Sequence, residues 1–147
     1  MNNTKANNSV MKNLRHLSLL LIFCVGVLTS LTDCTTHPKA EGELLYSMYC
    51  SNCHLDDGKG LGALIPPLAG SDYLVKHRDE LACLLVHGIA DTIYVNGQMY
   101  AEAMPGAEKL SHIEVTNILN YIQNAWGNNY GRFQPEDVRS SLKACDH

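Results

Sequence analysis

The residues with the clearest chemistry are Cys50, Cys53 and His54, which lie in the pentapeptide CSNCH. Two thiols separated by two residues and followed directly by a histidine form the C-x-x-C-H pattern through which a c-type haem is attached. Each thiol can add across one vinyl group of the porphyrin, and the histidine is then carried beneath the macrocycle, where its imidazole can bind the iron. The pattern predicts one covalent haem c, with thioether bonds to Cys50 and Cys53 and with His54 as the proximal iron ligand.

Two other kinds of site also contain a C-x-x-C pair. A thioredoxin-like redox couple lies beside a βαβ pattern, and this sequence contains no run of buried parallel strands. A zinc site needs two further ligands at ordered spacing, whereas the remaining Cys and His residues are scattered singly. Both alternatives are therefore less favoured than haem attachment.

A proline pair lies at a fixed distance from the motif, because Pro66 stands twelve residues after His54 and is followed by Pro67. With this spacing the chain resembles the class I (mitochondrial-type) cytochromes c over residues 41–126. The resemblance implies an all-α fold of three to five helices around one covalent haem, with a small β-hairpin before the loop that carries the axial methionine. It also implies that a proline carbonyl accepts the N–H of the proximal imidazole. Pro66 is expected to do this, with Pro67 as the alternative, and both prolines would also serve as a rigid loop corner.

The resemblance points to Met104 as the distal iron ligand. In the family the axial methionine lies on a loop just before the last helix and is often followed by proline, as Met104 is by Pro105. A thioether is a soft ligand that favours ferrous iron, so a His/Met pair raises the reduction potential. Met99 is the alternative, although strand alternation points it away from the face of Tyr100, so that it is expected to pack in or on the hairpin. Three further histidines, His77, His87 and His112, are weaker candidates for an axial ligand, since a lone histidine is more often a surface residue.

Three helices are expected to carry these residues. The first covers residues 41–52, where apolar side chains recur at helical spacing. A short amphipathic helix is expected over residues 79–88. The last runs from about Ser111 to Trp126 and begins with the capping-box pair of Ser111 and Glu114.

Two smaller features complete the expected domain. An Asn-Gly dipeptide at Asn96 lies between β-favouring residues and predicts a hairpin that delivers the chain to the methionine loop. In class I cytochromes c the first and last helices cross closely, and Gly42 and Tyr46 match the first helix of that pair. Ile118 and Tyr121 match the opposing ridge. These four are packing residues rather than reactive ones.

The first 33 residues have the pattern of an export signal. A polar, basic leader is followed by an apolar run over residues 17–28 that is short for spanning a bilayer. The alternative is an uncleaved membrane anchor. The sequence LTDC that ends at Cys34 resembles the lipobox of bacterial lipoproteins, although aspartate replaces the usual small residue before the cysteine. We therefore expect a periplasmic protein, either tethered to the membrane by a lipid on Cys34 or freely soluble, with residues 34–40 as a linker.

An extension of residues 127–147 follows the segment that resembles the family. Proline and two acidic residues predict a helix that begins near Pro135, and the spacing places Val138 and Cys145 on one apolar face. A disulfide between Cys83 and Cys145 is one outcome in an oxidising compartment, and two free thiols are the other.

Composition limits the partners. The chain has a net charge of −4, and residues 34–147 contain eight basic and fourteen acidic side chains. A nucleic-acid partner is therefore not expected. An acidic surface instead favours a protein partner whose docking site is rich in Lys and Arg. The length suits one folded domain.

The predicted function is one-electron transfer. With both axial positions filled by protein, no coordination site is open to a substrate, so an electron carrier is expected rather than an enzyme. The resemblance implies redox partners such as a cytochrome-reducing complex and a terminal oxidase or nitrite reductase. Two alternatives are a ligand-binding or sensory haem protein and an accessory haem subunit of a dehydrogenase or reductase complex.

Overall fold

The computed structural model describes residue 16 and residues 38–145 of the chain. Cys34 and, apart from residue 16, the predicted signal at residues 1–33 lie outside the described residues. Among the residues that the structure describes, no helix combines the length and the apolar character that a membrane span needs.

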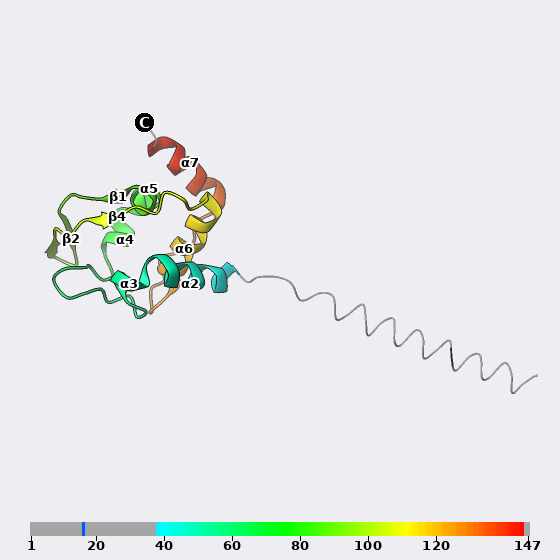
Figure 1. Ribbon diagram of the computed structural model, residues 1–147, viewed down its shortest axis with the longest axis horizontal. Coiled ribbons are helices and arrows are strands. Elements are labelled where there is room, and N and C mark those ends of the chain that lie inside the picture. The colour runs from blue at the N-terminus through cyan, green and yellow to red at the C-terminus, as the bar shows by residue number, and fades with distance from the viewer. Residues whose placement is uncertain (1–15, 17–37, 146–147) are drawn as a thin grey trace, which may run out of the picture. The chain divides into compact units, whose positions relative to one another are not determined.

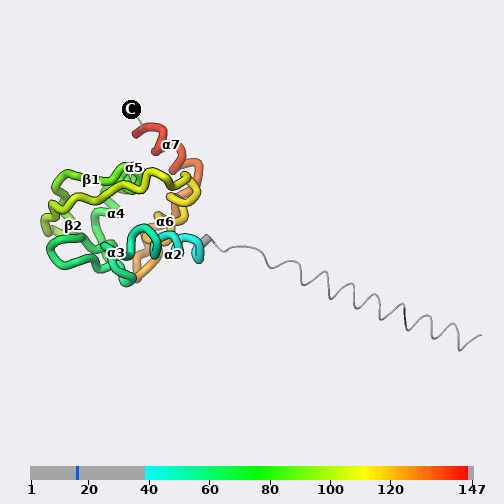
Figure 2. Tube along the Cα trace, in the orientation of Figure 1, coloured from blue at the N-terminus to red at the C-terminus, as the bar shows by residue number. Residues whose placement is uncertain are grey.

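Seven helical segments and four short strands make up residues 38–145 (Figure 1). The helices are α2 (Pro38–Tyr49), α3 (Ser51–His54), α4 (Tyr73–Lys76), the 3-10 turn η1 (Arg78–Glu80), α5 (Leu81–His87), α6 (His112–Asn124) and α7 (Pro135–Cys145). The strands are β1 (Gly88–Ile89), β2 (Ile93–Val95), β3 (Gln98–Tyr100) and β4 (Met104–Pro105). The Cα trace in Figure 2 shows that the segment leading into α6 runs beside α5.

The first helix differs from its predicted bounds at both ends. It begins at Pro38, so residues 38–40, expected to be a linker, are helical. Proline favours this position because its fixed φ suits the first turn and its missing N–H has no partner there. The helix ends at Tyr49, and the C-x-x-C-H motif forms a separate turn, α3, because Cys50 leaves helical geometry at φ −121°.

The last predicted helix has the expected start. Ser111 caps α6: its hydroxyl accepts a hydrogen bond from the backbone N–H of Glu114, whose carboxylate accepts one from the N–H of Ser111. Both halves of the capping box are therefore confirmed. The helix ends at Asn124, two residues before the predicted Trp126.

Helices α2 and α6 make the most extensive helix contact of the domain. Tyr46 and Ile118 are both buried at this crossing. A Cβ atom on Gly42 would overlap the carbonyl oxygen of Asn117. The absence of a side chain at Gly42 is therefore what lets the two helices approach.

We expect Gly42→Ala to destabilise the domain by about 1–3 kcal/mol, because overpacking against a backbone atom forces the helices apart. The sign of the change in stability is informative, since glycine to alanine at an open helical position stabilises a protein by about 0.5–1 kcal/mol. Thermal unfolding followed by circular dichroism measures the difference. An unchanged or raised melting temperature would show that the crossing is looser than described.

Two small antiparallel sheets lie beside the helices. The predicted hairpin is confirmed: β2 and β3 pair with Tyr94 opposite Met99, and Asn96 and Gly97 both have positive φ, at 52° and 79°. The pairing of β1 with β4, in which Ile89 lies opposite Met104, was not predicted. Strands of two residues carry no alternation for a sequence pattern to detect. The described residues form a helical domain with small antiparallel strands rather than an all-α fold.

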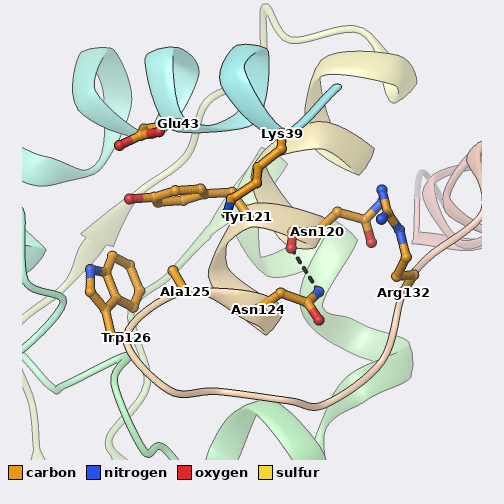
Figure 3. A pocket seen from close by; sticks show the side chains of 8 residues that line it. All are labelled: Lys39, Glu43, Asn120, Tyr121, Asn124, Ala125, Trp126 and Arg132. Atoms are coloured by element: carbon orange, nitrogen blue, oxygen red, sulfur yellow. Dashed lines mark hydrogen bonds between the residues drawn. The ribbon is translucent and has the colours of Figure 1, made fainter. Parts of the chain in front are cut away.

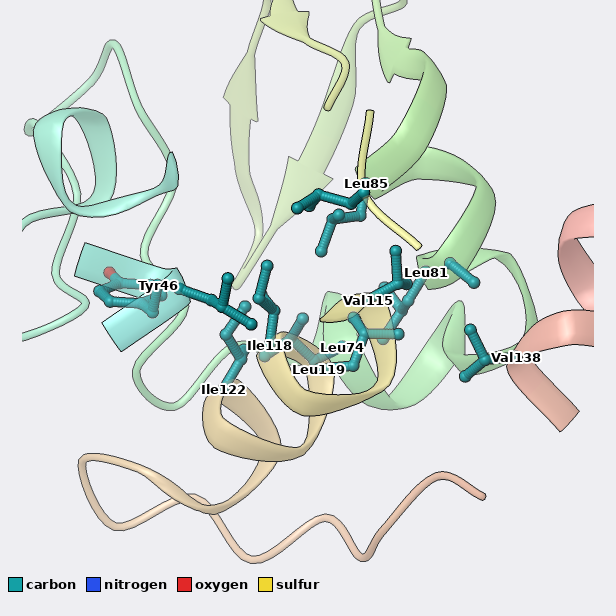
Figure 4. Close-up of a cluster of buried hydrophobic side chains, with 12 residues drawn as sticks. Tyr46, Leu74, Leu81, Leu85, Val115, Ile118, Leu119, Ile122 and Val138 are labelled. Atoms are coloured by element: carbon teal, nitrogen blue, oxygen red, sulfur yellow. The ribbon is translucent and has the colours of Figure 1, made fainter. Parts of the chain in front are cut away.

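The buried side chains form one cluster that α6 organises (Figure 4). Val115, Ile118, Leu119 and Ile122 of α6 supply its centre. Side chains from α2, α4, α5 and α7 surround them: Leu45, Tyr46, Leu74, Leu81, Leu85 and Val138. Helix α7 of the extension is thus part of the core, since Val138 is only 1% exposed.

The extension is also covalently joined to the domain. A disulfide links Cys83 of α5 to Cys145 at the end of α7. This was one of the two expected outcomes for these thiols, and it leaves Cys50 and Cys53 as the free cysteines of the described residues.

Candidate functional site

The C-x-x-C-H motif is held by a single helical turn. The backbone N–H groups of Cys53 and His54 both donate to the carbonyl oxygen of Cys50, at 3.1 and 2.9 Å. Cys50 is partly buried, Cys53 is exposed, and the His54 side chain is 8% exposed. The turn therefore directs the histidine inward and leaves one thiol at the surface.

The predicted contact between His54 and Pro66 is confirmed. Nδ1 of the imidazole lies 3.1 Å from the carbonyl oxygen of Pro66. A carbonyl oxygen can only accept, so Nδ1 carries the proton and Nε2 keeps its lone pair. Burial lowers the pKa of His54, and the hydrogen bond to Pro66 opposes this only in part. The imidazole is therefore neutral at neutral pH, which is the form that binds a metal.

Glycines in the loop after the motif allow this contact. Gly60 has φ +69°, and a Cβ atom there would overlap the carbonyl oxygens of Ile65 and Pro66. Gly58 has φ +67°, and a Cβ atom there would meet the ring of Trp126. These close approaches are to the chain itself, and the one at Gly60 brings Pro66 to His54.

An apolar cavity lies between the motif and the methionine segment. Cys50, His54, Pro66 and Met104 all contribute to its wall. The rest of its wall is nearly all apolar and includes Leu68, Leu74, Leu81, Leu84, Leu85, Ile89, Ile93, Val95, Leu119 and Ile122. It contains about 700 Å³ of empty space, part of it open to solvent.

A smaller adjoining cavity extends the same space. It shares His54, Pro66 and Met104 with the larger one, as well as Ile89 and Ile93, and Cys53 lies at its wall. The two cavities together therefore contact all five predicted site residues. Two thiols, one neutral imidazole and one thioether around an apolar space suit a haem, which needs two covalent attachments, two axial ligands and a dry surrounding.

The two candidate methionines lie in different surroundings. Met104 is on β4 and lines both cavities. Met99 is on the outer side of the hairpin opposite Tyr94, where its side chain is 57% exposed. Among the described residues, only Met104 of this pair shares a cavity with His54.

The three weaker histidine candidates do not line either of these two cavities. His77 stacks on Tyr73 at 4.0 Å between ring centroids and is 3.2 Å from a carboxylate oxygen of Glu80. His87 ends α5, and His112 begins α6. None of the three is among the described residues that line the cavity of His54.

A separate hollow lies where α2 meets the end of α6 (Figure 3). Its wall is mixed: it contains charged side chains and amides as well as the rings of Tyr121 and Trp126. The charged residues are Lys39, Glu43 and Arg132, and the amides are Asn120 and Asn124. The Asn124 amide already donates to the carbonyl oxygen of Asn120 at 2.9 Å. This hollow shares no lining residue with the apolar cavity and lacks the donor set of a haem site.

Sequence reasoning missed a hydrogen bond that fixes the chain directly after the motif. The hydroxyl of Tyr46 donates to the carbonyl oxygen of Leu55 at 2.6 Å, and Leu55 has φ 62°. The Tyr46 ring packs against Tyr121 and Trp126, with centroids 5.2 and 5.0 Å away. Tyr46 was identified as a packing residue, but its polar end had no signal because the acceptor is a main-chain atom.

We expect Tyr46→Phe to destabilise the protein by about 1 kcal/mol at pH 7, the usual contribution of such a hydrogen bond. Burial raises the pKa of Tyr46 far above its ordinary value of about 10. The native protein therefore loses stability as pH rises above 10, where the phenol ionises in the unfolded chain alone, at up to about 1.4 kcal/mol per pH unit. Chemical denaturation at pH 7 to 11 measures the free energy of unfolding of both proteins. The native protein should be the more stable one at pH 7 and the less stable one near pH 11. A difference that does not change with pH would contradict this.

Comparisons with known proteins match this part of the chain. The family model described as Cytochrome c matches residues 39–126, which include the motif and Met104. Cytochrome c-552 of Thermus thermophilus is 34% identical over 93 residues, covering 60% of this chain and 70% of that protein. The cytochrome c subunit of a quinone alcohol dehydrogenase from Komagataeibacter europaeus is 35% identical over 92 residues, which is 61% of this chain and 19% of the subunit. The corresponding subunit of Gluconobacter oxydans is 32% identical over 89 residues and is also covered to 19%.

Proposed function

The chain belongs to the cytochrome c family and is an electron-transfer protein with covalent haem c, and from this premise we propose which of its residues hold that haem. Cys50 and Cys53 form the two thioether bonds. His54 is the proximal iron ligand and Met104 the distal one. The observation that carries this proposal is that Cys50, His54 and Met104 line one apolar cavity.

The protein residues set the conditions for electron transfer. The haem supplies a one-electron change between ferric and ferrous iron. The carbonyl oxygen of Pro66 accepts the Nδ1 proton of His54, which fixes the ring and raises its basicity. The thioether of Met104 favours the ferrous state. Because His54 and Met104 would both bind the iron, no coordination site would be left for a substrate, and the chain would act as a carrier rather than an enzyme.

Expression in a host with the cytochrome c maturation machinery tests the proposal. We expect red protein, a reduced-minus-oxidised spectrum typical of haem c, and a band that stains for haem after denaturing electrophoresis. Colourless protein, or pigment that acidified acetone extracts, would overturn it, since thioether bonds survive that treatment.

The fold that we propose is that of the class I cytochromes c. It is supported by the crossing of α2 with α6, by the motif turn α3 directly after α2, and by a methionine segment that precedes α6. The paired strands β1 and β4 are an addition to the helical framework.

We also propose export, with a lipid on Cys34 that tethers the domain to the membrane. Helix α2 begins at Pro38, so the chain from Cys34 to the domain reaches at most about 14 Å. The haem domain would then stay close to the membrane surface. Cells fed a tagged fatty acid should label the native protein and not Cys34→Ala. Absence of label, or label that survives the substitution, would rule out the tether.

Partners that exchange single electrons follow from this function. A cytochrome-reducing complex on one side and a terminal oxidase or nitrite reductase on the other are proposed. A second candidate is an accessory haem subunit, which the 35% identity to a dehydrogenase cytochrome c subunit supports. Purification under mild conditions separates the two: a carrier elutes alone, whereas a subunit elutes in a stable complex with a dehydrogenase.

A further inference from the structure

The extension of residues 127–145 is fastened to the α5 region at two points. At its start, the Arg78 guanidinium donates to the carbonyl oxygens of Tyr130 and Arg132, at 3.0 and 2.8 Å, and lies 3.9 Å above the Phe133 ring. At its end, Cys145 is bonded to Cys83. The match to the cytochrome c family ends at residue 126, so both fastenings reach a part of the chain beyond it.

Helix α5 stands between the extension and the apolar cavity. Leu81, Leu84 and Leu85 of this helix line the cavity. Cys83 lies between them in sequence and is bonded to α7 instead. Helix α7 contacts both α5 and α6, and in the view of Figure 1 it lies above α5. The extension therefore supports α5 from the side away from the cavity.

The end of α5 is joined to the methionine segment by backbone contacts. Strand β1 follows the helix directly and pairs with β4, where Ile89 lies opposite Met104. The N–H of Ala107 donates to the carbonyl oxygen of Leu85 at 3.0 Å. These contacts hold the chain at Met104 and on its C-terminal side.

Glycines at this junction leave no free space. A Cβ atom on Gly88 would overlap the carbonyl oxygen of Met104, and a Cβ atom on Gly106 would overlap that of Val86. The two backbones are thus in direct contact. A shift of α5 must therefore move the segment that carries Met104.

We propose that the C-terminal extension, clipped by the Cys83–Cys145 disulfide, is a positioning element for Met104: it fixes α5 and, through β1 and β4, keeps the thioether at the iron. The inference rests on the proposed role of Met104 as distal ligand. A neutral thioether is readily displaced by a stronger ligand, and the apparent affinity of a competitor is scaled by the fraction of molecules in which the methionine has moved away. The extension keeps that fraction small.

Imidazole binding to the oxidised, haem-loaded protein measures the fraction of molecules in which Met104 has moved away from the iron. In Cys83→Ala/Cys145→Ala we expect imidazole to bind about tenfold more tightly than in the native protein, because the open state is more populated. Hydrogen exchange at the Ala107 amide should accelerate by about the same factor, since its bond to Leu85 reports the same opening.

A matched control separates positioning from lost stability. Gly42→Ala weakens the contact of α2 with α6 and leaves the α5–β4 junction intact, so its imidazole affinity should stay within twofold of the native value. Equal gains in affinity in the control and the double variant would overturn the proposal, as would an unchanged affinity in the double variant.

A second variant covers failure of the double variant to fold. Arg78→Gln removes the other fastening and keeps the disulfide, and we expect it to raise imidazole affinity in the same direction by a smaller factor. An unchanged affinity in Arg78→Gln would then overturn the proposal. The native protein tests the proposed function separately. If it shows the sulfur-to-iron charge-transfer band while the imidazole affinity of the variants is unchanged, only the positioning role is refuted.

Discussion

Protein in which Cys50 and Cys53 are both replaced by alanine is expected to contain no covalently bound haem. The two thiols are the free cysteines of the described residues, and both lie at the cavities that His54 and Met104 line. Without them, haem could be held only by its axial ligands and apolar contacts, which denaturation removes. Haem-stained denaturing electrophoresis should show at least a hundredfold loss of signal relative to the native protein.

The disulfide cysteines provide the control for this experiment. Cys83→Ala/Cys145→Ala removes the same number of sulfur atoms at a bond between α5 and α7. It should keep full haem staining, although its stability should fall by about 4 kcal/mol, because a loop closed over a separation of 62 residues is released in the unfolded chain. Haem that stays attached in the Cys50→Ala/Cys53→Ala protein would mean that the attachment is elsewhere.

Features that depend on neighbours in sequence could be predicted. The capping box of Ser111 and Glu114 and the turn at Asn96 and Gly97 are confirmed because each is decided by side chains within four residues. The contact of His54 with Pro66 was predicted at a separation of twelve residues from a family resemblance rather than from physics.

Features that depend on distant backbone could not be predicted. The pairing of β1 with β4 joins residues fifteen and seventeen positions apart, and neither strand is long enough to show a pattern. Its consequence for the site is large, because Ile89 opposite Met104 places the methionine segment at the cavity. The hydrogen bonds from Arg78 to the extension could not be predicted either, since their acceptors are main-chain carbonyls.

The two methionines illustrate how tertiary structure narrows a choice that spacing leaves open. Both precede α6, Met104 by eight residues and Met99 by thirteen. Strand alternation pointed Met99 away from the face of Tyr100, and in the structure it is 57% exposed opposite Tyr94. Met104 contributes to both cavities instead. We therefore expect opposite results when each of the two methionines is replaced by alanine.

Met104→Ala is expected to remove the sulfur-to-iron charge-transfer band of the oxidised protein. It should also lower the reduction potential by about 0.2 V, which is a fraction of the range of roughly 0.8 V over which axial ligands set haem potentials. The soft thioether favours ferrous iron, and water that enters in its place favours ferric iron. The opened position should also bind carbon monoxide rapidly when the protein is reduced. Redox titration and optical spectra measure all three changes.

Met99→Ala is the matched control, because it shortens a methionine of the same segment at an exposed position. Its band and potential should equal those of the native protein, with a shift of no more than about 0.02 V, since the iron keeps both axial ligands. If the band instead persists in Met104→Ala and disappears in Met99→Ala, the hairpin must rearrange to bring Met99 to the iron. The cavity between His54 and Met104 would then be only part of the haem site, and the pairing of β1 with β4 would serve packing alone.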